Sequence, residues 1–321
     1  MNRRYATKAL GVGALAMMGM TQAAAQEFPK GPVKIIIPFP AGGPTDTVGR
    51  LIGQKLSELW HQPVVIDYKP GAGTAIGVDF VAKSAPDGQT FGIVNSSLAI
   101  NPYLHKKMAY QIKDLAMVTQ LVVLQQALVA RADAPFNNLA ELVAYAKQNP
   151  GKLTYGTPGA GSTTHLGAEL LKREAGFDML HSPFKGSSPA HTELMGGRID
   201  VLVDPFLSVI PYVKAGRMKM IATMGEKRVA GFDYPTAAET LPGFSVVGLL
   251  GIVAPAATPK AIVAKIQNDM SRILAVPETR KRIEDLGMEV VTTRPEQFEA
   301  FIQSEMKRWS RIIIEAKIES E

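Results

Sequence analysis

Three glycine-rich loops are the stretches of this sequence whose residue types and spacing suit ligand chemistry. They read "PFPAGGPTD" (residues 38–46), "KPGAGTAIG" (69–77) and "GTPGAGSTTH" (156–165), and each follows a β-type run and precedes a helical pattern. Glycine lets backbone N–H groups approach a ligand, and a helix start adds unpaired donors and the positive end of the helix dipole. Three such loops favour binding of an anion, although a tight turn that binds nothing remains the alternative for each.

The kind of anion is narrowed by what these loops lack. None of them ends in the Lys-Ser or Lys-Thr pair of a nucleoside-triphosphate loop. Gly71, Gly73 and Gly77 have a spacing similar to that of a dinucleotide loop, but no acidic residue follows about 20 positions later at a strand end. We therefore expect no nucleotide and no other cofactor.

Ser162 and His165 in the third loop raise an alternative, an exported serine hydrolase of small esters that uses Ser162. A nucleophile elbow needs a glycine two residues after its serine, and Thr164 stands there instead. Ser162 is better explained as the N-cap of the next helix, from where its hydroxyl could also donate to a carboxylate. None of the five histidines has a partner at metal-ligand spacing, so we expect no metal site.

Polar residues at strand ends are the remaining candidates. Asp46 falls in the first turn of a predicted helix, where a carboxylate suits the dipole and can accept loop amides, so a structural role is favoured. Asp204 ends the run "IDVLVD" before Pro205, and the carboxyl ends of strands in an open α/β sheet are where ligands bind. A turn cap is the alternative for Asp204. Further lining residues expected at this edge are Phe39, Asn95, Ser96 and Ser97.

The first 25 residues have the pattern of a secretory signal peptide. Arg3, Arg4 and Lys8 precede an uncharged apolar run that closes with three alanines, which predicts cleavage before Gln26. No later stretch reaches the roughly 20 apolar residues of a membrane-spanning helix. The sequence thus predicts an exported protein, with the route, general secretory or twin-arginine, left open.

Composition excludes several classes of protein. Of the formal net charge of +6, three positive charges lie in the leader, and the basic clusters near the C-terminus fall in helical patterns, so no nucleic-acid binding is expected. The chain has no cysteine, which excludes disulfides, thiolate nucleophiles and cysteine-based metal sites. A mature chain of this length suggests two lobes, each held by its own core.

The elements that must position the loops alternate in type along the chain. Apolar strand patterns at 33–38, 62–68, 89–95, 153–157 and 198–204 are each followed by a helical pattern, as in βαβ units on a mostly parallel sheet. Near the C-terminus, Thr258 is a predicted N-cap with Pro259 at the first helical position, and 293–296 reads as a capping box.

Two long apolar stretches, 114–133 and 244–259, read as extended strands that join two α/β units. This pattern predicts one domain inserted into another and a hinge made of two crossings. We expect a signal peptide at 1–25, a first lobe formed by 26–126 and 250–321, and a second, inserted lobe at 127–249.

With these motifs in view, the chain resembles the Bug family of tripartite tricarboxylate transporter substrate-binding proteins over nearly its whole mature length. The resemblance rests on segments that include "PFPAGGPTDTVGR", "GKLTYGTPGAGSTTHLGAELL", "PFKGSSPAHTELMGGRIDVLVD" and "GIVAPAATPK". It implies an α/β fold of the periplasmic-binding-protein type (type II), with two lobes that close on a small carboxylate held by backbone amides and ordered waters.

Carried over by position, the resemblance implies a set of ligand contacts. They are Phe39, Ala41, Gly42 and Gly43 in the first loop, Thr74 in the second, Pro158, Gly159, Ala160, Ser162 and Thr163 in the third, and Lys185, Gly186 and Asp204 in the second lobe. The sequence departs from the family pattern at Tyr68 and Lys69, where Asn and Arg are usual, and at Thr74-Ala75, where Gly-Asn is common.

These inferences predict a periplasmic solute-binding protein without catalysis, one that captures a mono- or dicarboxylate. Its expected partners are the carboxylate and either membrane permease subunits of a tripartite tricarboxylate-type transporter or the ectodomain of a sensor kinase, and it is expected to be a monomer. The hydrolase and a non-binding structural protein remain as alternatives from other classes.

Overall fold

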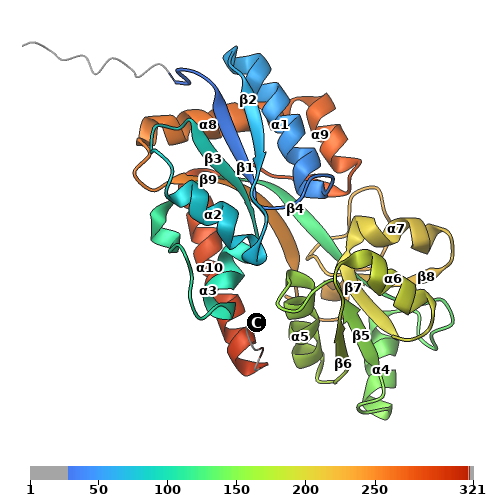
Figure 1. Cartoon of the computed structure of the whole chain (residues 1–321). Coiled ribbons are helices and arrows are strands. Elements are labelled where there is room, and N and C mark those ends of the chain that lie inside the picture. The colour runs from blue at the N-terminus through green and yellow to red at the C-terminus, as the bar shows by residue number, and fades with distance from the viewer. Residues whose placement is uncertain (1–27, 317, 319–321) are drawn as a thin grey trace, which may run out of the picture.

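A computed structural model describes residues 28–316 and residue 318 (Figure 1). The predicted leader and its cleavage site before Gln26 lie outside the described residues. Within them, no helix is both long and apolar enough to cross a membrane.

The predicted alternation of strands and helices is confirmed. The strands are β1 (Val33–Ile37), β2 (Val64–Tyr68), β3 (Thr90–Asn95), β4 (Leu115–Arg131), β5 (Thr154–Thr157), β6 (Leu180–Pro183), β7 (Val201–Pro205), β8 (Met218–Thr223), β9 (Val247–Pro255) and β10 (Met288–Val290). The helices are α1 (Pro44–Trp60), α2 (Ala75–Ala82), α3 (Ser97–Leu104), α4 (Leu139–Gln148), α5 (Thr163–Ala175), α6 (Ser187–Met195), α7 (Phe206–Lys214), α8 (Lys260–Ala275), α9 (Pro277–Glu284) and α10 (Pro295–Glu315). Short 3₁₀ turns lie at Ala72–Thr74, Ile112–Asp114 and Ala237–Glu239.

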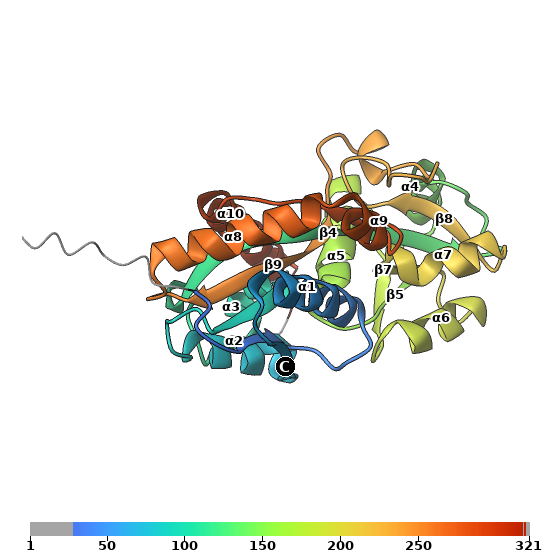
Figure 2. The ribbon, with the colours of Figure 1, turned by 90° about the horizontal axis from the view of Figure 1, so that it is seen from above.

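The strands form one continuous sheet with the order β2-β1-β3-β9-β4-β7-β5-β6, and β8 and β10 also pair with β4. β1 is parallel to β2 and β3, and β5 is parallel to β6 and β7, as βαβ connections require. β9 and β4 run antiparallel to their neighbours in the middle. Figures 1 and 2 show the helices gathered into two groups along this sheet, one around β1 to β3 and one around β5 to β8.

The long strand β4 belongs to both groups. Its residues from Leu115 to Gln125 pair with β9, and those from Gln126 onward pair with β7 and β8. The exchange of partners falls between Gln125 and Gln126, one residue before the boundary expected between 126 and 127. At the second proposed boundary, β9 already pairs with the first half of β4 from Val247, earlier than the predicted residue 250.

Alternation along the strands buries both faces of the sheet in each lobe. In the first lobe Ile35 and Ile37 face α1 and α8, whereas Ile36 faces α2 and α10. In the second lobe Val201 and Val203 pack with α4 and α5, and Leu202 packs with α6 and α7. These three-layer lobes confirm the predicted α/β fold class.

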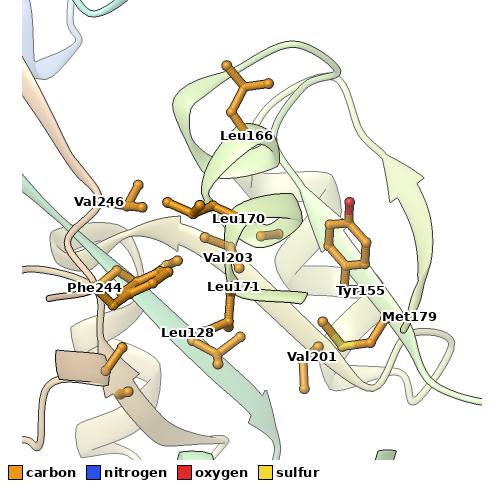
Figure 3. Packing of buried hydrophobic residues seen from close by; sticks show 14 of the residues in the cluster. Leu128, Tyr155, Leu166, Leu170, Leu171, Met179, Val201, Val203, Phe244 and Val246 are labelled. Atoms are coloured by element: carbon orange, nitrogen blue, oxygen red, sulfur yellow. The ribbon is translucent and has the colours of Figure 1, made fainter. Parts of the chain in front are cut away.

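Figure 3 shows the side of the second lobe that carries α5. Leu170 and Leu171 of α5 pack in one cluster with Leu128 of β4 and Val203 of β7, and Phe244 belongs to the same cluster. Fully burying side chains of this size is worth about 1.5–3 kcal/mol each. The helix that follows the third glycine loop is thereby fixed against the sheet.

Helix α10 connects the two lobes. Phe298 and Ile302 in its first half belong to the first lobe's core, with Ile36 and Val253. Trp309, Ile312 and Ile313 in its second half belong to the second lobe's cluster, which also includes residues of α3 from the first lobe. Both lobes therefore share this helix in addition to the two strand crossings.

Two predicted helix starts are wrong by one residue. Pro259, not Thr258, occupies the N-cap of α8, and the Thr258 hydroxyl is buried without a partner. At α10 the amide of Arg294 donates to Gln297 at 2.9 Å, so the capping box begins one residue later. Thr293 instead exchanges hydrogen bonds with Thr119 and Gln120 of β4, and this tertiary pairing displaced the predicted cap.

Candidate functional site

The first loop is fixed by a carboxylate that follows it. The amide of Gly42 donates to Asp46 at 2.8 Å, and the Tyr68 hydroxyl and the Arg50 guanidinium donate to the same carboxylate at 2.6 and 2.8 Å. Asp46 is only 5% exposed. The structural role favoured for Asp46 is therefore confirmed.

The electrostatics of this group keep Asp46 ionised. Burial alone would raise the pKa of Asp46, but hydrogen bonds from Tyr68 and Gly42 and the charge of Arg50 outweigh it and lower the pKa. The same hydrogen bond raises the pKa of Tyr68. Tyr68, which departs from the family pattern, ties β2 to the first turn of α1.

The second loop has a backbone in which four consecutive residues have positive φ. Gly71, Ala72, Gly73 and Thr74 have φ values of 127°, 45°, 57° and 86°. Thr74 is a β-branched residue, for which positive φ is a strained conformation. Its side chain is 5% exposed, and its hydroxyl neither caps α2 nor finds another partner. Asn101 of α3 holds the loop by donating to the Gly73 carbonyl at 2.7 Å.

The first two loops pack directly on each other. A Cβ added to Gly77 of α2 would stand 2.8 Å from the Cβ of Pro38 and 2.9 Å from the carbonyl oxygen of Lys69. The amide of Lys69 also donates to the carbonyl of Ile37 at 2.9 Å. Gly77 thus allows the ends of β1 and β2 to present their loops side by side.

The polar residues after β3 are partly used by the fold. Ser96 is buried, and its hydroxyl accepts the amide of Leu249 in β9 at 3.2 Å. Asn95 caps its own turn by accepting the amide of Ser97 at 3.1 Å. Asn95 and Ser97 are half-buried, so they remain available for a ligand at this edge, whereas Ser96 holds β9 in place.

In the third loop Ser162 is the N-cap of α5, as predicted. Its hydroxyl accepts the amide of His165 at 3.3 Å and donates to the Gly159 carbonyl at 2.6 Å. The amide of Gly161 donates to Nδ1 of His165 at 3.0 Å. Because the serine hydroxyl bonds to the loop and the histidine ring bonds to Gly161, these contacts form no nucleophile–base pair.

A second segment of the inserted lobe adjoins this loop. The amide of Gly186 donates to the carbonyl of Pro158 at 2.9 Å, which places Lys185 and Gly186 beside the third loop. Asp204 is fully buried, and its two oxygens accept from Ser187 at 2.7 Å and pair with His191 Nε2 at 2.8 Å. The carboxylate of Asp204 therefore anchors the start of α6 and does not face solvent as a strand-end ligand contact would.

Two histidines stack beneath the third loop. The rings of His165 and His181 lie 3.9 Å apart at an angle of 12°, and His181 Nε2 is 2.7 Å from the Thr157 hydroxyl. Burial, with a smaller contribution from Lys172, lowers the pKa of His165 to about 4. Burial and then the neighbouring His165 lower the pKa of His181 to about 4. Both rings are therefore neutral at pH 7.

The sixteen candidates fall into two groups, one in each lobe. The first lobe carries Phe39, Ala41, Gly42, Gly43, Thr74, Asn95, Ser96 and Ser97, and the second carries Pro158, Gly159, Ala160, Ser162, Thr163, Lys185, Gly186 and Asp204. Phe39 packs against the first lobe's core, and Ala41, Gly42, Ala160 and Lys185 are exposed. The third loop also touches the first lobe, because a Cβ added to Gly161 would stand 2.5 Å from Leu104 of α3.

Several side chains that support the candidate residues are not predictable from the sequence. Ser187 and His191 have the i, i+4 spacing of one helix face, which is the only signal in the sequence that could have linked them to Asp204. Tyr68 and Asn101, which hold the first two loops, lie 22 and 28 residues from the groups they bond, and no motif predicts these contacts. Five cavities on the outer surfaces of the described chain are lined by none of the sixteen candidates, and residues 28–316 hold no cluster of metal-binding side chains.

Comparison with known proteins identifies the family. The sequence profile described as "Tripartite tricarboxylate transporter family receptor" (TctC) matches residues 48–318. The chain belongs to this family. A "UPF0065 protein in gbd 5'region" of Cupriavidus necator is 35% identical over 309 residues, which cover 96% of this chain and 93% of that protein.

Two similar solved structures contain bound acids. "R. palustris Rpa4515 with adipate" has a TM-score of 0.80 at 30% identity, covering 92% of this chain and all of the other. "MatC (Rpa3494) from Rhodopseudomonas palustris with bound malate" has a TM-score of 0.71 at 33% identity, covering 89% of this chain and all of the other. The resemblance to this receptor family and the periplasmic-binding-protein fold are both confirmed.

Proposed function

We propose that this protein is a periplasmic solute-binding protein that captures a small mono- or dicarboxylate between its two lobes without transforming it. The observation that carries the proposal is the placement of three glycine loops, each at a helix start, on two lobes joined by β4 and β9. Adipate and malate in the two related structures support a carboxylate as the ligand.

The charges of the described loops fit such a ligand. The first turn of α5 and that of α2 contain no acidic residue, so their N–H groups and dipoles are not neutralised from within. In the first loop, Arg50 balances Asp46. Backbone donors of this kind accept any carboxylate, and we expect the space between the loops to select among acids.

Delivery is the second part of the proposal. A captured carboxylate would pass to membrane permease subunits of a tripartite tricarboxylate-type transporter or be reported to the ectodomain of a sensor kinase, with the receptor acting as a monomer. The leader supports this location, because cleavage before Gln26 would release the mature chain into the periplasm. Cell fractionation and N-terminal mass analysis of the mature protein test the location.

Binding is tested by calorimetry with the purified mature chain. Malate, adipate and a panel of related mono- and dicarboxylates are titrated, with the uncharged diamide of adipate as the matched control. We expect saturable binding of at least one acid and none of the diamide. Absence of binding to every acid, or turnover of an acid or its ester, would contradict the proposal.

Closure is tested separately by small-angle scattering. A ligand that contacts both lobes stabilises the closed state only as far as its affinity for the two states differs. We expect a smaller radius of gyration with a bound acid, and an unchanged profile with a proven ligand would contradict closure.

A further inference from the structure

The first and third loops each contain the same hydrogen bond between a loop amide and a side chain in the first turn of the following helix. In both, the amide of the glycine after an alanine donates to a side chain four residues later, Gly42 to Asp46 at 2.8 Å and Gly161 to His165 at 3.0 Å. Asp46 and His165 each stand third in their helix, after the N-caps Gly43 and Ser162. The two residues are therefore structural counterparts in opposite lobes.

The His165 ring is held in one orientation. It stacks on His181, whose own ring lies 4.7 Å from that of Tyr155 and whose Nε2 meets the Thr157 hydroxyl. His165 is 7% exposed. Because Nδ1 accepts the Gly161 amide, the proton of the neutral ring must sit on Nε2.

The hydrogen bonds within the third loop determine which of its backbone amides are free to bind a ligand. The Gly159 carbonyl is turned toward the helix start by the Ser162 hydroxyl, and the N–H of the same planar peptide, that of Ala160, points the opposite way. The next amide along the loop, that of Gly161, is bonded within the protein, because it donates to Nδ1 of His165. Ala160 is an exposed residue, and its amide is the one that we expect to meet a ligand.

We propose that His165 is a positioning residue, which binds the Gly161 amide through Nδ1 and so leaves the remaining amides of the loop to the ligand. Because its imidazole is neutral, it does this without placing a negative charge at the start of α5. The part that concerns the ligand rests on the proposed function. An aspartate would make the same hydrogen bond, as Asp46 does, but its charge would occupy the helix start that a carboxylate ligand needs.

Three substitutions separate these roles. His165→Asn keeps an uncharged acceptor of the Gly161 amide, His165→Asp keeps the acceptor and adds a charge, and His165→Leu removes the acceptor. We expect the affinity for malate or adipate, measured by calorimetry, to fall less than about threefold for His165→Asn and about tenfold or more for the other two. His61→Asn, at an exposed position outside the loops, is the matched control and is expected to bind as the wild type does.

These measurements distinguish a role of His165 in ligand binding from a role in stability alone. Urea unfolding of each variant shows whether it is folded. Equal affinities of the Asn and Asp variants overturn the charge argument, and a folded Leu variant with wild-type affinity overturns the positioning argument. Nitrogen NMR of the ligand-free protein reads the tautomer directly: an unprotonated Nδ1 supports the proposal and a protonated Nδ1 overturns it, even if the wild type binds neither acid and the proposed function fails.

Discussion

Gly77 lies against Pro38 so closely that a Cβ on Gly77 would stand 2.8 Å from the proline Cβ. This contact joins the first two loops, and real Cβ atoms do not approach so closely without a shift. The same Cβ would stand 2.9 Å from the Lys69 carbonyl oxygen, so the helix cannot relieve the contact by a small shift.

Gly77→Ala is expected to lower the free energy of unfolding by about 1–2 kcal/mol, because overpacking outweighs the better helix propensity of alanine. It should also weaken carboxylate binding by moving the loops apart. Urea unfolding and calorimetry measure the two effects. Gly31→Ala, whose Cβ meets only Gln89 at 3.8 Å, is the control and should change neither.

Thr74→Gly is expected to stabilise the protein by on the order of 1 kcal/mol. Threonine at a φ of 86° is strained, and glycine adopts this conformation freely. Ala75→Gly at the next residue, the first of α2 with a φ of −60°, should instead destabilise by up to about 1 kcal/mol. If thermal unfolding shows that Thr74→Gly melts at a lower temperature than the wild type, the side-chain contacts of Thr74 outweigh its backbone strain.

Acidification is expected to destabilise the protein between pH 6.5 and pH 4. His165 and His181 have their pKa values lowered to about 4 in the folded state, so the unfolded chain binds more protons in this window and stability falls as the pH falls. His165 alone should account for on the order of 2 kcal/mol between pH 7 and pH 5. Urea unfolding at both pH values measures this loss, which His165→Asn should reduce; an equal loss in that variant would contradict the assignment.

Asp204→Asn is expected to lower the free energy of unfolding by about 2–4 kcal/mol. The carboxylate is fully buried and bonded to Ser187 and His191, and an amide cannot accept with both of its ends. Asp133→Asn is the matched control, because the Asp133 side chain is 76% exposed in its ion pair with Arg131, and exposed pairs are worth about 0–1 kcal/mol. Similar losses in the two variants would show that the buried network contributes little.

Ile313 and Ile314 are adjacent in α10 and test its role between the lobes. Ile313 is 4% exposed in the second lobe's cluster, whereas Ile314 is 72% exposed. Ile313→Ala should destabilise by about 2–4 kcal/mol and loosen the packing of α10 on the second lobe, which scattering of the ligand-free protein would show as a larger radius of gyration. Ile314→Ala should leave stability and shape unchanged, and equal effects would exclude this interlobe packing.

Local signals were sufficient to predict the elements of this fold. The βα alternation, the Ser162 cap and the long strand at 114–133 follow from spacing and residue type within a few positions. Thr258 and Thr293 show where such signals fail: both carry good capping residues, but the fold buries one and pairs the other with β4. The candidate loops were also found from local pattern.

The partners of those loops were not predictable in the same way. Asn101, Tyr68 and His181 reach the loops only after the chain has folded, and nothing in their immediate sequence marks them. Asp204 was read as a strand-end group because its position is local, while its burial beneath α6 depends on tertiary packing. The sequence alone therefore predicts the candidate loops but not the residues that support them.

The central pairing of β3 with β9 and of β9 with β4 has a consequence for the order of folding. β9 lies between two strands that precede it by more than a hundred residues, with Asn95 paired to Leu250 and Leu115 to Pro255. Because contacts this distant in sequence form slowly, the first lobe's sheet stays incomplete until nearly the whole chain is available. The second lobe is contiguous from the latter half of β4 to β8, so it can reach its native pairing first and serve as the platform on which the first lobe closes.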